Sequence, residues 1–234
     1  MKKVAIMQPY FFPYIGYYQL MSCVDDFVIY DNIEFTKKGW INRNRILQNG
    51  SDKLITLPIK KNSDFLHISE RQISETAKID NQKTLNLIEA CYRKAPYFKE
   101  SIEMIIQCLQ YENNNLFDYL LNSLKKTTEY IGLEINFVRS SDIDINHNLK
   151  GQDKVIAICK KLEANIYVNA IGGTSLYSRD MFNSQNIELK FIKTKDIKYD
   201  QFGQDFVPNL SIIDIIMFNS RDEIKKMMDA YELI

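Results

Sequence analysis

The feature that most constrains this chain is a short apolar run at residues 3–7 that leads directly into the proline- and aromatic-rich segment 8–17. A run of this length and character is typical of a buried strand. The prolines and the glycine that follow prevent a helix from starting before about Tyr14. A helix-like stretch then leads to a second strand at residues 27–30, so the segment predicts a βαβ unit. Loops at the carboxyl ends of such strands are where α/β folds bind ligands.

Aromatic side chains dominate the loop of this unit, from Tyr10 to Tyr18. A solvated loop would be a poor place for so many large rings. Two interpretations stay open on composition alone: the rings line a ligand site, or they only close a hydrophobic mouth at the edge of the core.

The rest of the chain predicts further strands and helices around a helical insert. Apolar residues recur at helical spacing from about 81 to 131, which predicts amphipathic helices that serve as scaffold or lid. Asn49-Gly50 indicates a hairpin between strands at 46–47 and 54–59, although not at ideal two-residue spacing. The later elements are predicted as strands at 135–138, 166–168 and 189–192, helices at 155–162 and 178–186, and closing helices at 210–231 with Ser211 as a cap.

Together these elements predict one α/β domain over residues 1–234. Its sheet is expected to be Rossmann-like, mostly parallel and flanked by helices. Within it we expect an N-terminal βαβ part (1–60), the helical insert (about 81–131) and a C-terminal α/β part (132–234). A chain of 234 residues is long enough to bury a substantial core.

The charge balance and the cysteines argue against several classes of protein. The chain has 30 basic residues (Lys and Arg) and 30 acidic residues (Asp and Glu), so no bulk attraction to nucleic acid or acidic membranes is expected. No stretch approaches the roughly 18 apolar residues of a membrane helix, and the first apolar run is too short for a signal peptide. The 4 cysteines are scattered, without the paired spacing of a zinc site or a disulfide framework. We therefore expect a cytoplasmic, reduced protein that binds small molecules, without a metal site or membrane insertion.

A dense set of hydrogen-bond donors follows the second strand. The run from Lys37 to Arg45 holds the single tryptophan together with lysines, arginines and asparagines. Arginine suits planar or doubly charged acceptors such as phosphate and carboxylate, so the run is a candidate anion site. Strand alternation would place Asn42 and Asn44 on one face and Arg43 and Arg45 on the other. At least one of these arginines is expected to be structural.

A second polar loop follows the strand at 166–168. It contains Asn169 and the pair Gly172-Gly173, whose backbone amides could face an anion. A lone Gly-Gly is weak evidence, because no Walker or dinucleotide fingerprint surrounds it. Residues 150–153 add polar side chains just before the predicted helix at 155–162.

Several segments carry a resemblance to a known family. In chain order they are QPYFFPYIGYYQL, VIYDNIEFTKKGWINRNRI, KAPYF, KGQDKVIAICKKL, VNAIGGTSLY, ELKFIK and FVPNLSIIDIIMFNS. They resemble the WbqC-like protein family over nearly the whole chain. The resemblance implies a setting, the synthesis of bacterial O-antigen and other surface polysaccharides, and a suggested reaction, the transfer of glycine onto an amino sugar.

A weaker likeness concerns the first loop. Many nucleotidylyltransferases and adenylate-forming amide ligases, such as pantothenate synthetase, begin with a strand, a loop that holds His-x-Gly-His, and a helix. Tyr14-Ile15-Gly16-Tyr17 stands in that place, with tyrosine at both histidine positions and glycine where a helix N-terminus approaches phosphates. Neutral tyrosine donates a hydrogen bond but lacks the positive charge of an imidazolium. That charge would then come from basic residues elsewhere: Arg43, Arg45, Lys37, Lys38 or Lys150.

The leading hypothesis is a transferase that forms an amide on a nucleotide-linked amino sugar. Asp31, at the end of the second strand, is the first candidate for the base that takes the proton of the attacking amine, and Asp153 is the second. Asp31 could equally close the strand as a turn cap. The acyl donor is either a mixed anhydride with AMP, formed in the site from ATP, or a preformed activated donor. The residues expected to bind substrate are Gln8, Tyr10, Tyr14, Gly16, Tyr17, Lys37, Asn42, Arg43, Asn44, Arg45, Lys150, Gln152, Asn169, Gly172 and Gly173.

Two rival hypotheses stay open. The first is a catalytically inactive nucleotidylyltransferase-like module that binds a nucleotide sugar or a partner enzyme, which the loss of both histidines favours. The second is a glycosyltransferase, for which Asp142-Ile143-Asp144 has the letters of a metal motif but lies in a polar connector. His67 and His147 stand alone in polar loops and are interpreted as incidental.

Overall fold

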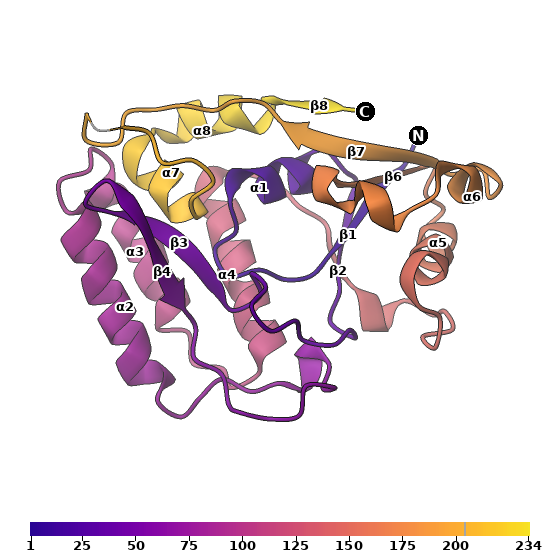
Figure 1. The fold of residues 1–234 in the computed structure, drawn as a ribbon, viewed down its shortest axis with the longest axis horizontal. Coiled ribbons are helices and arrows are strands. Elements are labelled where there is room, and N and C mark those ends of the chain that lie inside the picture. Colours follow the sequence, from indigo (N-terminus) through magenta and orange to yellow (C-terminus); the bar gives the residue numbers. More distant parts are fainter. Residues whose placement is uncertain (204) are drawn as a thin grey trace.

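A mostly parallel sheet forms the centre of the computed structural model, which describes residues 1–203 and 205–234 (Figure 1). Within this described chain, six strands pair in the order β5-β2-β1-β6-β7-β8, and every neighbouring pair is parallel except β7 and β8. The predicted α/β fold with a mostly parallel sheet is therefore confirmed. The strands are β1 (Lys3–Met7), β2 (Asp26–Ile29), β5 (Phe137–Arg139), β6 (Ile166–Ala170), β7 (Glu188–Thr194) and β8 (Tyr231–Leu233).

Helices cover both faces of this sheet. Successive strand residues point to opposite faces, so Ala5 and Phe27 join one hydrophobic cluster whereas Val4 and Val28 join another. Burial on both faces explains why the strands are continuous apolar runs in the sequence. The first face is covered by α1 (Ile15–Ser22), α7 (Ile212–Phe218) and α8 (Arg221–Met228), and the second by α5 (Gly151–Lys161) and α6 (Arg179–Asn183).

The helical insert lies between the hairpin and β5, as predicted, and begins four residues earlier, at Ala77 rather than 81. Its helices are α2 (Ala77–Tyr92), α3 (Phe98–Leu109) and α4 (Leu116–Ile131). The Asn115 side chain caps α4 by accepting from the backbone N–H of Asp118 at 3.2 Å, and Gly132 ends the helix with a positive φ of 79°. The insert shares one hydrophobic cluster with the first face of the sheet. None of the helices in residues 1–203 and 205–234 has the length and apolar character needed to cross a membrane.

A separate hairpin, β3 (Arg43–Gln48) and β4 (Ser51–Thr56), packs against α2 and α7. Asn49 and Gly50 form a two-residue turn, and both have positive φ, 50° and 75°. This is the backbone that a tight hairpin requires, and asparagine and glycine adopt it most readily. The expectation of a non-ideal spacing was wrong, because both strands extend to the turn and β3 already begins at Arg43.

The C-terminal segment differs from the predicted pair of closing helices only at its end. Ser211 caps α7 by accepting from the backbone N–H of Ile213 at 3.2 Å, and Ser220 begins α8 with a capping box to Glu223. Residues 231–233 form β8 and pair antiparallel with β7 at the sheet edge. In the sheet, β6 and β7 lie between β8 and β1, the strand that follows the N-terminus (Figure 1).

The strand order places a topological switch point between β1 and β6. From β1 the chain crosses through α1 to β2 on one side, whereas the connection from β5 through α5 returns to β6 on the other side. Ligands in open α/β sheets bind beyond the carboxyl ends of the strands at such a point. The loops that follow β1, β2, β5 and β6 are therefore the place to look for a site.

Candidate functional site

The carboxyl ends of β1 and β6 bring together residues that the sequence predicts at the site. Lys3 pairs with Ile166, so Gln8, which follows β1, and Asn169, near the end of β6, lie at the same edge of the sheet. Asn169 is buried, and its Oδ1 accepts from the backbone N–H of Ala170 at 2.8 Å. A Cβ at Gly173 would lie 2.5 Å from Asn169 Nδ2, so a larger residue here would displace the Asn169 side chain. A Cβ at Gly172 would instead meet no atom within 4 Å.

The aromatic loop is mostly part of the core. Tyr17 is fully buried, and its hydroxyl donates to the backbone carbonyl of Gln8 at 2.7 Å. Burial raises the pKa of Tyr17 well above its ordinary value. A Cβ at Gly16 would lie 2.5 Å from the ring of Tyr14, so Gly16 makes room for that ring. Tyr14 lines a cleft of about 670 Å³ with the segment 194–199. Of the two tyrosines at the histidine positions, Tyr17 thus has its hydroxyl committed to the backbone.

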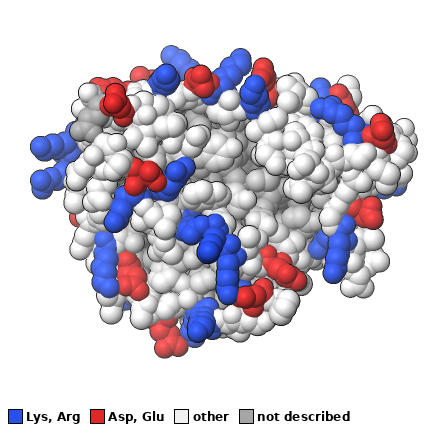
Figure 2. All heavy atoms as spheres, in the orientation of Figure 1, with Lys and Arg blue, Asp and Glu red and all other residues white. Residues whose placement is uncertain are grey.

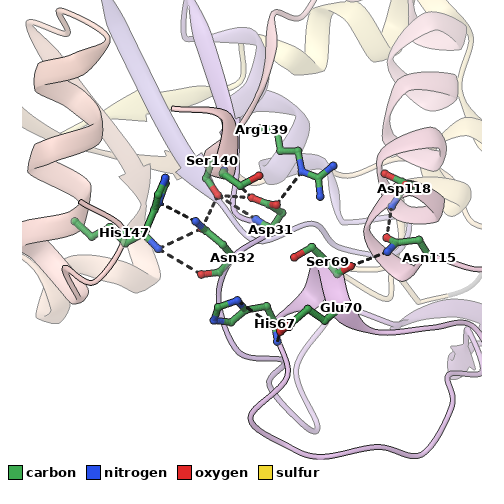
Figure 3. Close-up of polar contacts among 12 residues, drawn as sticks. Asp31, Asn32, His67, Ser69, Glu70, Asn115, Asp118, Arg139, Ser140 and His147 are labelled. Carbon is green, nitrogen blue, oxygen red and sulfur yellow. Dashed lines mark hydrogen bonds and ion pairs between the residues drawn. The ribbon is translucent and has the colours of Figure 1, made fainter. Parts of the chain in front are cut away.

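Asp31 is the centre of a buried polar cluster at the carboxyl ends of β2 and β5 (Figure 3). Its Oδ2 accepts from Arg139 Nε at 2.8 Å, and its Oδ1 accepts from Ser140 Oγ at 2.7 Å and from the backbone N–H of Ser141 at 2.9 Å. Burial raises the pKa of this carboxyl, but the hydrogen bonds from Arg139, Ser140 and Ser141 outweigh burial and hold the pKa below its ordinary value. The carboxylate is therefore ionised and engaged on both oxygens.

Asn32 extends this cluster toward α5. Its Oδ1 accepts from Lys154 Nζ at 3.2 Å and lies 2.8 Å from Ser140 Oγ, and its Nδ2 lies 2.9 Å from His147 Nδ1. Lys154 is buried, and burial lowers its pKa more than the charge of Asp31 raises it. Figure 3 shows His147 beside Asn32, so this histidine takes part in the cluster although the sequence gives no sign of it.

Asn44 fastens the aromatic loop to the hairpin. It is buried, and its Nδ2 donates to the backbone carbonyls of Phe11 at 3.1 Å and Phe12 at 2.8 Å. Phe12 has a positive φ of 42°, so the loop adopts a backbone that needs support from its surroundings. Asn42 makes a similar bond elsewhere, from Nδ2 to the carbonyl of Leu57 at 2.9 Å. Both asparagines thus hold backbone in place.

Arg43 and Arg45 share the opposite side of β3, as strand alternation predicts. Their guanidinium carbons lie 5.8 Å and 5.3 Å from the centre of the Trp40 ring. Arg43 donates through Nε to the carbonyl of Gly39 at 2.9 Å, so it closes its own loop. Arg45 lies 3.6 Å from a carboxylate oxygen of Asp52. Each arginine therefore has a structural contact and keeps its positive charge near the surface.

Lys37, Asn42 and Arg43 line one basic cleft of about 440 Å³ between the loops that follow β2 and β4. Figure 2 shows Lys and Arg side chains gathered near the middle of the face of the molecule that is drawn there. Asp64 is the only carboxylate among the described lining residues, and it pairs with Lys37 at 2.8 Å. The basic side chains that line the cleft are Lys37, Lys38, Arg43, Lys60, Lys61 and Arg71.

The basic cleft is connected to the Asp31 cluster by paired backbone. Segment 31–35 runs beside segment 66–69: the carbonyl of Asp31 accepts from the N–H of Ser69 at 3.1 Å, and the N–H of Phe35 donates to the carbonyl of Leu66 at 3.3 Å. The loop after β2 therefore leads from the edge of the sheet to the basic cleft.

Lys150, Gln152 and Asp153 stand apart from the basic cleft. Lys150 and Asp153 are exposed at the start of α5, and Gln152 Oε1 accepts from the backbone N–H of Ser178 at 2.6 Å, just before α6. Within residues 1–203 and 205–234, no three His, Cys, Asp or Glu side chains gather in an arrangement that could hold a metal ion.

The residues that the sequence did not single out fall into two groups. Arg139, Ser140 and Lys154 surround Asp31, and Arg71 and Lys60-Lys61 line the basic cleft. Lys60-Lys61 is a visible basic pair, but the polar segment 60–72 has no motif or periodicity. Only the fold brings either group together.

Comparisons with known proteins agree with the motifs. The model of the WbqC-like protein family matches residues 8–226. A protein of Mycobacterium tuberculosis (strain ATCC 25618 / H37Rv) named "Uncharacterized protein Rv1507c" is 28% identical over 222 residues, which cover 92% of this chain and 93% of that protein. No solved structure matches the chain significantly.

Proposed function

Because this chain belongs to the WbqC-like protein family, we propose that it is an amide-forming transferase that acts on a nucleotide-linked amino sugar during the synthesis of bacterial surface polysaccharide. The observation that supports this most is the basic cleft, since a diphosphate is bound by clustered cations. The cleft is formed by loops on the carboxyl side of the sheet, where α/β folds bind ligands. The proposal places the reaction in the cytoplasm.

In the proposed reaction, the amine of the sugar attacks the carbonyl carbon of an activated glycyl group. A C–N bond forms, and the bond to the activating group breaks, with its electron pair leaving on that group; the group is AMP if ATP activates glycine. The attacking amine must lose a proton to a base. Asp31 is engaged by Arg139 and Ser140, so we assign it a positioning role. The exposed Asp153 remains the predicted base.

The direct test is to incubate the full chain with UDP- or dTDP-linked amino sugars, glycine and ATP, and to analyse the products by mass spectrometry. We expect a product that carries one additional glycyl group in amide linkage. Glycine-dependent exchange of pyrophosphate into ATP would assign the adenylate route, and product formed only from a preformed donor would assign the other route. Absence of product with every donor would contradict the transferase.

A second candidate is the inactive module that binds a nucleotide sugar without turning it over. The observation that favours it is the state of Tyr17, whose hydroxyl is bound to the Gln8 carbonyl and cannot replace a catalytic histidine. Calorimetric binding of a nucleotide sugar without product, under the conditions of the turnover assay, would support this candidate over the transferase.

A further inference from the structure

We propose that the basic cleft is a diphosphate-binding site and that Arg71, which no sequence motif marks, is its anchor. This deepens the proposed function, on which it rests for the identity of the ligand, because it states where the phosphates of the substrate bind.

Arg71 is a buried guanidinium without a carboxylate. It is 3% exposed, lines the cleft, and forms no ion pair with any described residue. Its Nη2 donates to the carbonyl of Ser63 at 2.8 Å, and its Nε is buried with no hydrogen-bond partner in the described chain. Its guanidinium carbon lies 4.4 Å from the centre of the Phe35 ring, and this contact fixes the plane of the guanidinium group. A buried charge is costly unless it is paired, and an anion in the cleft would supply the pair.

The charges around Arg71 suit a ligand with more than one negative charge. Lys37 is neutralised by Asp64, and Lys60 lies 3.1 Å from Glu75. Lys38, Lys61 and Arg43 have no carboxylate within ion-pair distance among the described residues, and both lysines are exposed. Together with Arg71 they leave a local excess of positive charge that one carboxylate could not balance. The chain as a whole has no net charge, so this is a compact site rather than a nucleic-acid surface.

The rim offers an aromatic surface next to these cations. Trp40 is 40% exposed, and its ring contacts Arg43, which lines the cleft. An exposed ring beside a phosphate site is a surface on which a nucleoside base can stack. Since Trp40 is the single tryptophan of the chain, its fluorescence reports occupation of this site.

The test is calorimetric titration of the full chain with inorganic pyrophosphate and with UDP, followed in parallel by Trp40 fluorescence. Arg71→Gln should weaken the affinity for both ligands about 10- to 100-fold, since a charge-assisted contact is lost. Arg71→Lys should restore only part of the affinity, because lysine lacks the planar fork. The matched control is Arg221→Gln: Arg221 lies over the Tyr130 ring at 4.3 Å, a similar stacking contact far along the chain in α8, and its loss should leave both affinities unchanged.

A second variant keeps the proposal testable if Arg71→Gln does not fold. Lys38→Gln with Lys61→Gln removes two exposed cations and should weaken pyrophosphate binding roughly 2- to 10-fold without changing the melting temperature. Unchanged pyrophosphate affinity in folded Arg71→Gln, or in this double variant, would overturn the diphosphate site even if glycyl transfer is found. Arg71-dependent pyrophosphate binding without any glycyl transfer would uphold the site and reject the proposed reaction.

Discussion

At the scale of single residues, Asp31 shows how a predicted catalytic group can be a structural one. Its folded pKa lies below the ordinary value of 3.8, so the stability it contributes is present above that pH and is lost as pH falls through the folded pKa. Asp31→Asn should therefore lower the free energy of unfolding by about 1–3 kcal/mol at neutral pH, and by less at about pH 3. Urea denaturation at the two pH values measures the difference.

The exposed Asp153 supplies the control for this prediction. Asp153→Asn removes a carboxylate from the first turn of α5 and should cost no more than about 1 kcal/mol at either pH. If Asp31→Asn abolished turnover while its unfolding curve matched that of the wild type, the positioning role would be wrong and Asp31 would be the base.

Residue roles were harder to predict than residue positions. The sequence indicates that polar groups follow the strands, and Gln8 and Asp31 do so, whereas Asn169 lies inside β6, one residue before its end. It does not show that Asp31 meets Arg139, because the two lie 108 positions apart and only the pairing of β2 with β5 joins them. The contacts of Arg71 are harder still to predict, because Arg71 lies in the polar segment 60–72, which has no periodicity in the sequence.

At the scale of elements, the aromatic loop is held by two elements that are remote in sequence. The Phe12 carbonyl accepts from Asn44 Nδ2 at 2.8 Å, in β3, and from Ser211 Oγ at 2.8 Å, at the start of α7. In either single variant, Asn44→Ala or Ser211→Ala, the buried carbonyl keeps one donor. In the double variant the carbonyl keeps neither donor. The free energy of unfolding of the double variant should therefore fall by at least about 0.5 kcal/mol more than the sum of the two single decreases.

Urea denaturation of the four proteins measures this coupling. Asn42→Ala provides the comparison, because Asn42 donates to the Leu57 carbonyl and shares no partner with Ser211. The decrease in the free energy of unfolding caused by Asn42→Ala should add to the decrease caused by Ser211→Ala. Additive losses for Asn44 and Ser211 as well would show that the loop is not held at Phe12.

The elements themselves follow the local pattern of the sequence closely. Apolar runs mark β1 and β2, and Gly132 marks the end of α4. The missed element is β8, whose three residues carry too short a pattern to distinguish a strand from a fraying helix. Pairing with β7 decides its structure, and that contact is invisible in the local sequence.

At the scale of the whole molecule, a buried carboxylate joins the insert, the hairpin and the C-terminal part. Asp214, in α7, is fully buried and accepts from Tyr92 Oη at 2.7 Å, Tyr199 Oη at 2.6 Å and Gln201 Nε2 at 2.6 Å. Tyr92 Oη in turn accepts from the N–H of Leu47 in β3 at 2.7 Å. No cation neutralises Asp214 among the described residues. Burial raises its pKa, and the hydrogen bonds from Tyr199, Tyr92 and Gln201 only partly oppose this.

The pH dependence of stability should reveal this group separately from Asp31. Between the ordinary value of 3.8 and the raised folded pKa of Asp214, the native protein binds a proton that the unfolded chain has lost, so stability falls as pH rises through this window. Asp214→Asn does not titrate, so the free energy of unfolding of the wild type relative to this variant should decrease with rising pH above 3.8. Asp31 acts in the opposite sense, and below 3.8. Urea denaturation of both proteins across this range measures the slope. A relative stability that stays level above pH 3.8 and rises with pH only below it would mean that the tyrosine and glutamine donors outweigh burial and keep Asp214 ionised at the junction of these elements.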